Sequence, residues 1–311
     1  MKRLLLLLPL LFCLSQPAQA QDDDEGTRLE RLIEDALSSE GTQVTVRGFR
    51  GALSSQATME RMTIADEDGI WLTLENAELD WSRLALLRGR LQVDTLSAER
   101  LEVARTPTSN TEAPAPEASG QPFSLPDLPV SVNVGEFRVD RVELGAPLIG
   151  EPVVLTVSGA AQLADGDGNV ELDVQRVDGP RDALTFAGSY ANESRQLSLD
   201  LVLDEASGGL LTTKANLPGA PDLRLTLQGK GPIDDFTAAL ALATEGEDRF
   251  SGDITLQGSV GADHRFAADL SGDLRPLLPD EQRAFLGDNQ LLRTSGVVEA
   301  AGAIELDTLE L

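Results

Sequence analysis

Few residues of this chain could perform chemistry, and their spacing does not match a known catalytic arrangement. The sequence holds a single histidine, His264, which lies between Asp263 and Arg265 in an alternating segment. A serine or cysteine nucleophile needs a base that a third group holds in place, and the pattern around His264 offers none. Zinc sites need several histidine or cysteine ligands, which the chain lacks. The residues predict a protein that is not an enzyme and binds no cofactor; a hydrolase that depends on His264 stays as a third hypothesis.

Two loops resemble ion-binding or phosphate-binding motifs without matching them. The run Asp-Gly-Asp-Gly-Asn at residues 165–169 begins like a calcium loop, but its sixth position is Val170 and its twelfth is Arg176. A calcium loop of that type needs glycine and glutamate there. The run Gly-Lys-Gly-Pro at 229–232 lacks the preceding residues of a phosphate loop. We therefore predict a tight hairpin turn at 165–169 and no metal site.

The charge balance excludes one class of partner. The chain has 52 acidic and 25 basic residues, which gives a net charge of −27. Such a field repels phosphate backbones and anionic lipid surfaces, so nucleic-acid binding is not expected. The acidic residues are best interpreted as a solubilising surface for an otherwise sticky fold.

The first twenty residues have the pattern of a secretory signal peptide. Lys2 and Arg3 precede an apolar run from Leu4 to Leu14, and Ala18-Gln19-Ala20 provides a cleavage pattern. This apolar run is short for a membrane span, although an uncleaved anchor stays as the alternative. The only cysteine, Cys13, lies inside the signal, so the mature chain is predicted to contain no disulfide.

The rest of the chain divides into four predicted segments. Apolar residues at helical spacing predict an amphipathic helix within 21–41, which would close one end of a sheet. A first block of strands covers 42–105, and a proline-rich linker follows at 106–125. A second, repetitive block of strands runs from 126 to 311 and ends on an alternating segment, which suggests a longer parent protein.

Alternation of apolar and polar residues is the main structural signal of both blocks. Residues 91–103 predict two strands, and further strands are predicted to start near 130, 137, 153, 170, 184, 197, 223, 236, 250 and 264. Helical turns are predicted at 84–87 and 279–286. The predicted fold is mainly β: an elongated, curled antiparallel sheet, like a groove, with a short N-terminal helix and few helical turns.

Such a sheet has one apolar face, and its use is the central question. Two sheets could bury their apolar faces against each other in a closed core. Alternatively, one open sheet could hold acyl chains, which apolar burial stabilises at roughly 25 cal/mol per Å2 without specific hydrogen bonds. Polarity alone selects the candidate lining of such a groove: Val132, Val134, Leu155, Val157, Leu172, Val174, Leu199, Leu201, Leu203, Leu223, Leu225, Leu227, Leu240 and Leu242.

A series of short motifs resembles the N-terminal region of the TamB family, a subunit of the bacterial translocation and assembly module within the AsmA-like group. In the first block, the order Asp-Gly-x-Trp-Leu, Asp-Trp, Leu-Leu-x-Gly-x-Leu and Leu-x-Ala-x-x-Leu carries the resemblance. These motifs lie in 64–72, 79–82, 86–91 and 96–101, and the segment Gly-Phe-Arg-Gly-Ala-Leu at 48–53 resembles the same family. In the second block the resemblance lies in 128–145, 208–210, 217–221 and 229–236.

The resemblance implies a fold, a function and partners. It implies an elongated β-structure that crosses the periplasm and carries phospholipid acyl chains in a hydrophobic groove, while assisting protein assembly in the outer membrane. The implied partner is an outer-membrane barrel of the Omp85 type, TamA, reached through a C-terminal region expected to lie beyond residue 311. The implied location is the periplasm, with the N-terminal segment either cleaved or tethering the chain to the inner membrane. A secreted structural or adhesive β-solenoid with a closed core is the alternative.

Overall fold

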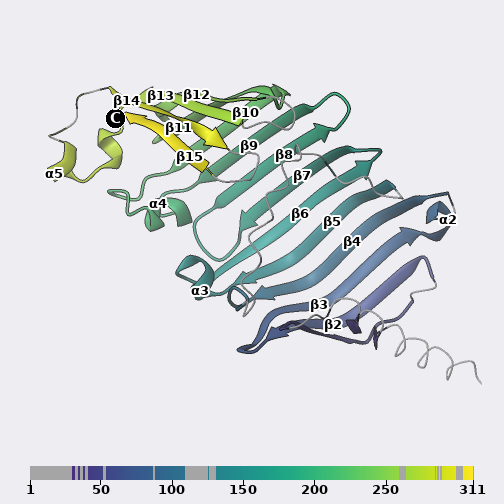
Figure 1. Cartoon of the computed structure of the whole chain (residues 1–311). Coiled ribbons are helices and arrows are strands. Elements are labelled where there is room, and N and C mark those ends of the chain that lie inside the picture. The colour runs from purple at the N-terminus through teal and green to yellow at the C-terminus, as the bar shows by residue number, and fades with distance from the viewer. Residues whose placement is uncertain are drawn as a thin grey trace, which may run out of the picture.

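A computed structural model shows one continuous sheet of fifteen strands (Figure 1). It describes residues 30, 31, 34, 35, 38, 41–51, 54–86, 88–108, 125, 131–258, 264–283, 285, 287, 289–298 and 304–310. The predicted signal peptide and most of the predicted linker lie outside these residues. The strands follow one another in space in the order of the chain, so both sequence blocks belong to the same sheet.

The strands of the first block are β1 to β4, and those of the second are β5 to β15. Their bounds are Gln43–Arg47, Gln56–Asp66, Gly69–Ser82 and Arg90–Val103 for β1 to β4. For β5 to β10 they are Ser131–Leu144, Val153–Ala164, Asp167–Arg176, Asp182–Ala191, Gln196–Glu205 and Leu223–Pro232. For β11 to β15 they are Asp235–Thr244, Glu247–Gln257, His264–Gly272, Gln290–Val298 and Ile304–Glu310.

Short helices sit at the ends of the strands. They are α2 (Arg83–Leu86), α3 (Ala146–Ile149), α4 (Leu210–Lys214), a 3-10 turn at Arg275–Leu277 and α5 (Asp280–Arg283). In Figure 1, α3, α4 and α5 lie at one end of the strands and α2 lies at the opposite end. The predicted helical turns at 84–87 and 279–286 therefore correspond to α2 and α5. No helix within the described ranges is long and apolar enough to cross a membrane.

The sheet is antiparallel except between β4 and β5, which run parallel. The predicted sheet was antiparallel throughout, so this pair corrects the expectation. Parallel neighbours need a crossover that returns the chain to the starting end of the first strand. Residues 104–130 make that connection, which explains why the proline-rich linker stands between the two blocks.

Strands β3, β4 and β5 are each fourteen residues long, and for β4 and β5 the sequence predicted pairs of shorter strands. In β4, the apolar residues Val93 and Leu96 are three positions apart rather than two. The pairing of β4 with β5 omits Asp94 opposite Gly135 and resumes beyond them. An extra residue of this kind bends a strand and increases its twist without ending it. The three-residue spacing therefore marks an irregularity inside one strand, which simple alternation interprets as a break.

The edge at β1 is covered by side chains of the N-terminal helical residues. The Glu34 carboxylate accepts a hydrogen bond from the Val46 N–H at 2.7 Å, and the Ser38 hydroxyl accepts one from the Val44 N–H at 3.0 Å. The Glu30 carboxylate accepts a third, from the Phe49 N–H, at 2.9 Å. These acceptors satisfy backbone groups that an exposed edge strand would offer to another chain. These three side chains cover the end of the sheet at β1, and two of them, Glu30 and Glu34, come from residues in helical conformation.

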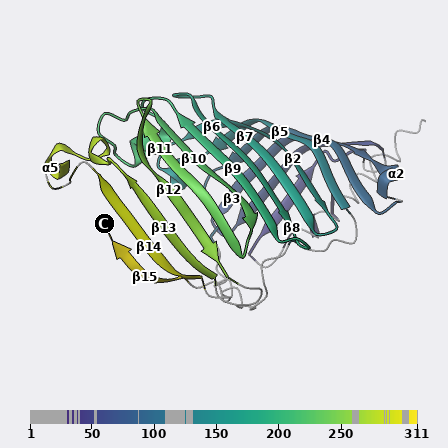
Figure 2. The ribbon, with the colours of Figure 1, turned by 90° about the horizontal axis from the view of Figure 1, so that it is seen from above.

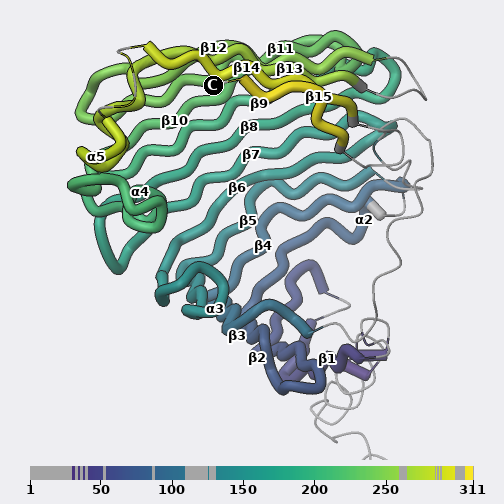
Figure 3. The backbone as a smooth tube through the Cα atoms, turned by 60° about the vertical axis from the view of Figure 1, so that its left-hand side comes forward, coloured from purple at the N-terminus to yellow at the C-terminus, as the bar shows by residue number. Residues whose placement is uncertain are grey.

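The sheet is curled and open. The described pairings join each strand to its sequence neighbours and leave β1 and β15 as the two edges. Seen from above and from the side, the sheet curves along its length, so that the last strands, β12 to β15, turn away from the direction of β4 to β8 (Figures 2 and 3). This architecture confirms the predicted mainly β, open and curled sheet.

Candidate functional site: the apolar face of the sheet

Residues that pair directly across antiparallel strands share a face, so the register shows which side chains lie together. One row runs through six strands, from β6 to β11: Val157, Val174, Leu184, Leu203, Leu225 and Leu242. A second row runs from β7 to β11: Leu172, Phe186, Leu201, Leu227 and Leu240. By the same pairing, the remaining candidates Val132, Val134, Leu155, Leu199 and Leu223 fall on this side of the sheet. We call this side the apolar face.

The register also places residues on the apolar face that the sequence prediction did not include. In the first block they are Leu72, Leu74, Leu79, Leu96 and Leu101. In the last strands they are Ile254, Leu256, Leu270 and Leu292. The spacing of two and three positions in β3 and β4 was the signal that could have identified the first set. The apolar face therefore extends over both blocks.

The apolar face is shielded at its margins and half-buried at its centre. Val93, Val153, Leu223 and Phe250 are buried, with 1–8% of their surface exposed. The central leucines of β9, Leu199, Leu201 and Leu203, are only half-buried. Among the described elements, each strand is in contact mainly with its neighbours in the sheet. A second layer packed on β9 would bury these leucines almost completely, as in a sandwich core.

Phenylalanine rings of the apolar face lie over glycines rather than standing away from the sheet. A Cβ on Gly229 would come within 2.6 Å of the Phe236 ring, and one on Gly296 would come within 2.7 Å of the Phe266 ring. The Phe137 ring lies against its register partner Gly159 in the same way. A ring over glycine covers backbone that would otherwise be bare. The lining consequently stays thin where these three rings lie over glycine.

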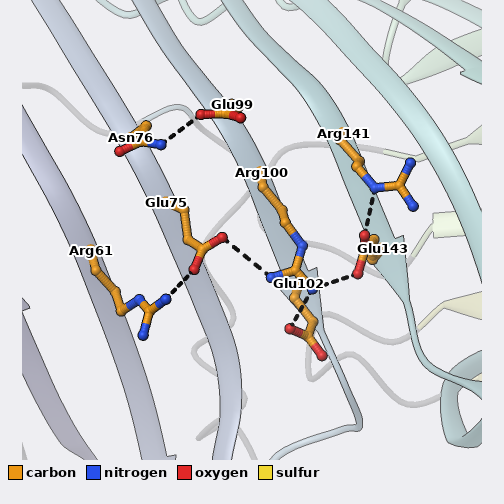
Figure 4. Close-up of polar contacts among 8 residues, drawn as sticks. All are labelled: Arg61, Glu75, Asn76, Glu99, Arg100, Glu102, Arg141 and Glu143. Atoms are coloured by element: carbon orange, nitrogen blue, oxygen red, sulfur yellow. Dashed lines mark hydrogen bonds and ion pairs between the residues drawn. The ribbon is translucent and has the colours of Figure 1, made fainter.

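The opposite face is polar and carries a row of ion pairs across β2 to β5 (Figure 4). Glu75 bonds Arg61 at 2.5 Å and Arg100 at 3.3 Å, and Arg100 bonds Glu143 at 2.6 Å. The hydrogen bond from Arg100, supported by one from Arg141, lowers the pKa of Glu143 to about 2. Hydrogen bonds from Arg61 and then Arg100 also lower the pKa of Glu75. The row therefore stays ionised over the whole neutral range.

A polar cluster ends the apolar face on the side of α4. The Glu205 carboxylate accepts hydrogen bonds from the Leu211 N–H at 2.6 Å and the Thr212 N–H at 3.0 Å, while Asp182 accepts one from the Leu210 N–H at 3.1 Å. These two carboxylates satisfy the free backbone donors at the start of α4. In the register the two carboxylates are partners: Glu205 lies two residues after Leu203 in β9, and Asp182 lies two residues before Leu184 in β8. The cluster fixes α4 at the margin of the apolar face.

Other parts of the molecule that could in principle bind an ion or perform chemistry were compared with the apolar face. A hollow of about 1140 Å3 lies over the polar face, where Asp204, Asp222 and Asp248 contribute to its lining. Within the described part of the chain, no group of acidic, histidine or cysteine side chains could hold a metal ion. Asp165 and Gly166 form the turn between β6 and β7 with positive φ angles of 53° and 77°, which confirms the predicted hairpin turn. The side chain of His264 lies outside the described residues.

The apolar face is thus the candidate site: its lining is mainly aliphatic, and such a lining can bind a ligand by burial of apolar surface alone. The comparisons with models of known families, with curated proteins and with solved structures find no match to this chain.

Proposed function

We propose that the protein is a non-enzymatic, lipid-conducting subunit whose apolar face holds phospholipid acyl chains. The observation that carries the proposal is the continuous row of aliphatic residues through six strands, from Val157 to Leu242. Aliphatic side chains without directional polar groups bind an acyl chain at many equivalent positions, so the chain can slide from strand to strand. The half-buried lining supports this function over a β-solenoid with a closed core.

The setting of this activity follows from the sequence. The signal-like N-terminus and the resemblance to the TamB family support a periplasmic location, with the N-terminal segment either cleaved or tethering the chain to the inner membrane. The same resemblance supports a role in outer-membrane biogenesis, in phospholipid transfer and in protein assembly. The partner proposed on this basis is an Omp85-type barrel in the outer membrane.

The test exchanges one residue on each face of the same strand. Leu201→Arg places a charge on the apolar face, whereas Val202→Arg places the same charge on the polar face of β9. We expect phospholipid to co-purify with the wild-type protein and with Val202→Arg, and to be lost from Leu201→Arg. Lipid mass spectrometry measures the amount per protein, and circular dichroism checks that both variants are folded.

Two results would contradict the proposal. One is a wild-type protein that carries no phospholipid after purification without detergent and takes up none from vesicles. The other is equal lipid content in the folded Leu201→Arg and Val202→Arg proteins.

A further inference from the structure

One residue of the crossover, Leu125, lies on the apolar face and is held there by a turn. Its N–H donates a hydrogen bond to Asn192 Oδ1 at 2.8 Å, and its carbonyl accepts one from Asn192 Nδ2 at 2.9 Å. Asn192 follows the end of β8, on the margin opposite α4. The amide therefore clamps both backbone groups of Leu125, as a neighbouring strand would.

The side chain of Leu125 has a matching seat. A Cβ on Gly168 would lie 2.7 Å from Leu125 Cδ1 and 3.6 Å from Leu163 Cδ1. Gly168 pairs with Leu163 on one side and with Tyr190 on the other, so all three belong to the apolar face. The missing side chain at Gly168 leaves a low point in this row, and Leu125, which is half-buried, fills it.

We propose that Leu125 is an internal occupant of the apolar face that competes with acyl chains at the margin of β6 to β8. This inference rests on the proposed function, because it names what regulates access to the same face. An isobutyl group and a methylene chain fill the same low point above Gly168, so only one can be there at a time. The side-chain amide of Asn192 binds only backbone groups of Leu125. These two hydrogen bonds can therefore form again each time an acyl chain leaves.

Two substitutions unseat Leu125 by different means. Gly168→Ala places a methyl group where Leu125 Cδ1 lies, and Asn192→Ala removes the clamp. Asn169→Ala, on the polar face of β7, is the matched control. Hydrogen exchange at the Leu125 amide measures how firmly Leu125 is held at Gly168 and Asn192. Titration with a phospholipid that bears a fluorescent acyl chain measures the affinity of the apolar face for lipid. Thermal unfolding confirms that each variant is folded.

We expect faster exchange at Leu125 in both variants and unchanged exchange in Asn169→Ala. Their Kd for the phospholipid should fall about three- to tenfold, which is the scale set by partial burial of one aliphatic side chain. Saturating phospholipid should also speed exchange at Leu125 in the wild-type protein.

The outcomes separate the two proposals. The competition is overturned if phospholipid binds equally well to the wild type and to both folded variants, and if lipid does not change hydrogen exchange at Leu125 in the wild type. The proposed function would still stand. Failure of every form to bind phospholipid overturns the proposed function and the competition with it, even where the exchange data support the seat.

Discussion

Strands β2–β5 and strands β6–β14 build the same two-faced sheet from different sequence spacings. In β7 the apolar face receives Val170, Leu172 and Val174, every second residue. In β4 it receives Val93, Leu96 and Ala98, where a polar pair, Asp94 and Thr95, is inserted. The face is therefore continuous although the period changes. The comparison shows that apolar residues stay on the same face along the whole sheet, although their spacing in the sequence differs between the two regions.

The insertion at Glu99 is matched in both neighbouring strands. The insertion at Asp94 is matched in β5 only, and the register between β3 and β4 shifts beside it, between Asp80 and Trp81. Glu99 of β4 has no partner in the pairing with β3 or with β5, and neither do Asn76 and Asp140 at the corresponding positions. The mismatch is taken up between β5 and β6, where the register shifts twice because β6 alternates regularly. The row of ion pairs on the polar face runs beside these insertions, through Glu75 and Arg100 (Figure 4).

The largest expected difference between the regions comes from deleting one residue. Deletion of Asp173 from β7 turns Val174 to the polar face, because a one-residue slip reverses every later side chain of the strand. Deletion of Glu99 from β4 leaves Ala98 and Leu101 two positions apart and therefore on one face. We expect no folded protein after the first deletion, and a folded protein destabilised by about 2–3 kcal/mol after the second. Urea unfolding followed by circular dichroism measures both; equal damage from the two deletions would refute the distinction.

A smaller difference is expected for the ion pairs. Arg100 bonds Glu75, Glu102 and Glu143 and is 31% exposed at its side chain, whereas the pair of Arg224 with Asp204 in the second region is at least half exposed. We expect Arg100→Met to lower the free energy of unfolding by about 1–2 kcal/mol, because it removes the guanidinium that Glu75, Glu102 and Glu143 share. Arg224→Met should change it by less than about 0.5 kcal/mol. Similar changes in the free energy of unfolding for both substitutions would show that the row of ion pairs does not stabilise the first region.

The smallest expected effect is a pH dependence of the first region. The pKa of Glu143 is lowered from 4.5 to about 2 by its hydrogen bonds from Arg100 and Arg141. A carboxyl group with a lowered pKa stabilises the fold above its unfolded pKa, and this contribution is lost as the pH falls through the folded value. Between pH 4.5 and pH 2 the wild type should therefore lose about 1 kcal/mol more stability than Glu143→Gln.

Thermal unfolding across this pH range measures that difference. In the Arg100→Met background the effect of Glu143→Gln should shrink, because its main partner is already absent. An undiminished effect would assign the pH dependence to other carboxylates.

Much of the fold followed from alternation, and the exceptions have definite causes. Strands such as Leu223–Pro232 were predicted near their observed starts because each has one apolar face and ends at a turn. Strand β14, Gln290–Val298, was missed because Leu291 and Leu292 are adjacent and interrupt the alternation. Strands β4 and β5 were each predicted as two strands because local alternation carries no information about a neighbour with a matching insertion.

The sequence by itself determined the fold class: a mainly β chain in which aliphatic residues alternate with polar, often acidic, ones. These properties are local, since the type of a residue and its alternation are fixed before the chain folds. The tertiary structure decided the parallel pairing of β4 with β5, the joining of both blocks into one face and the seat of Leu125 over Gly168. These depend on which strands become neighbours and in what register, and contacts between distant residues such as Leu125 and Asn192 exist only after the sheet has formed.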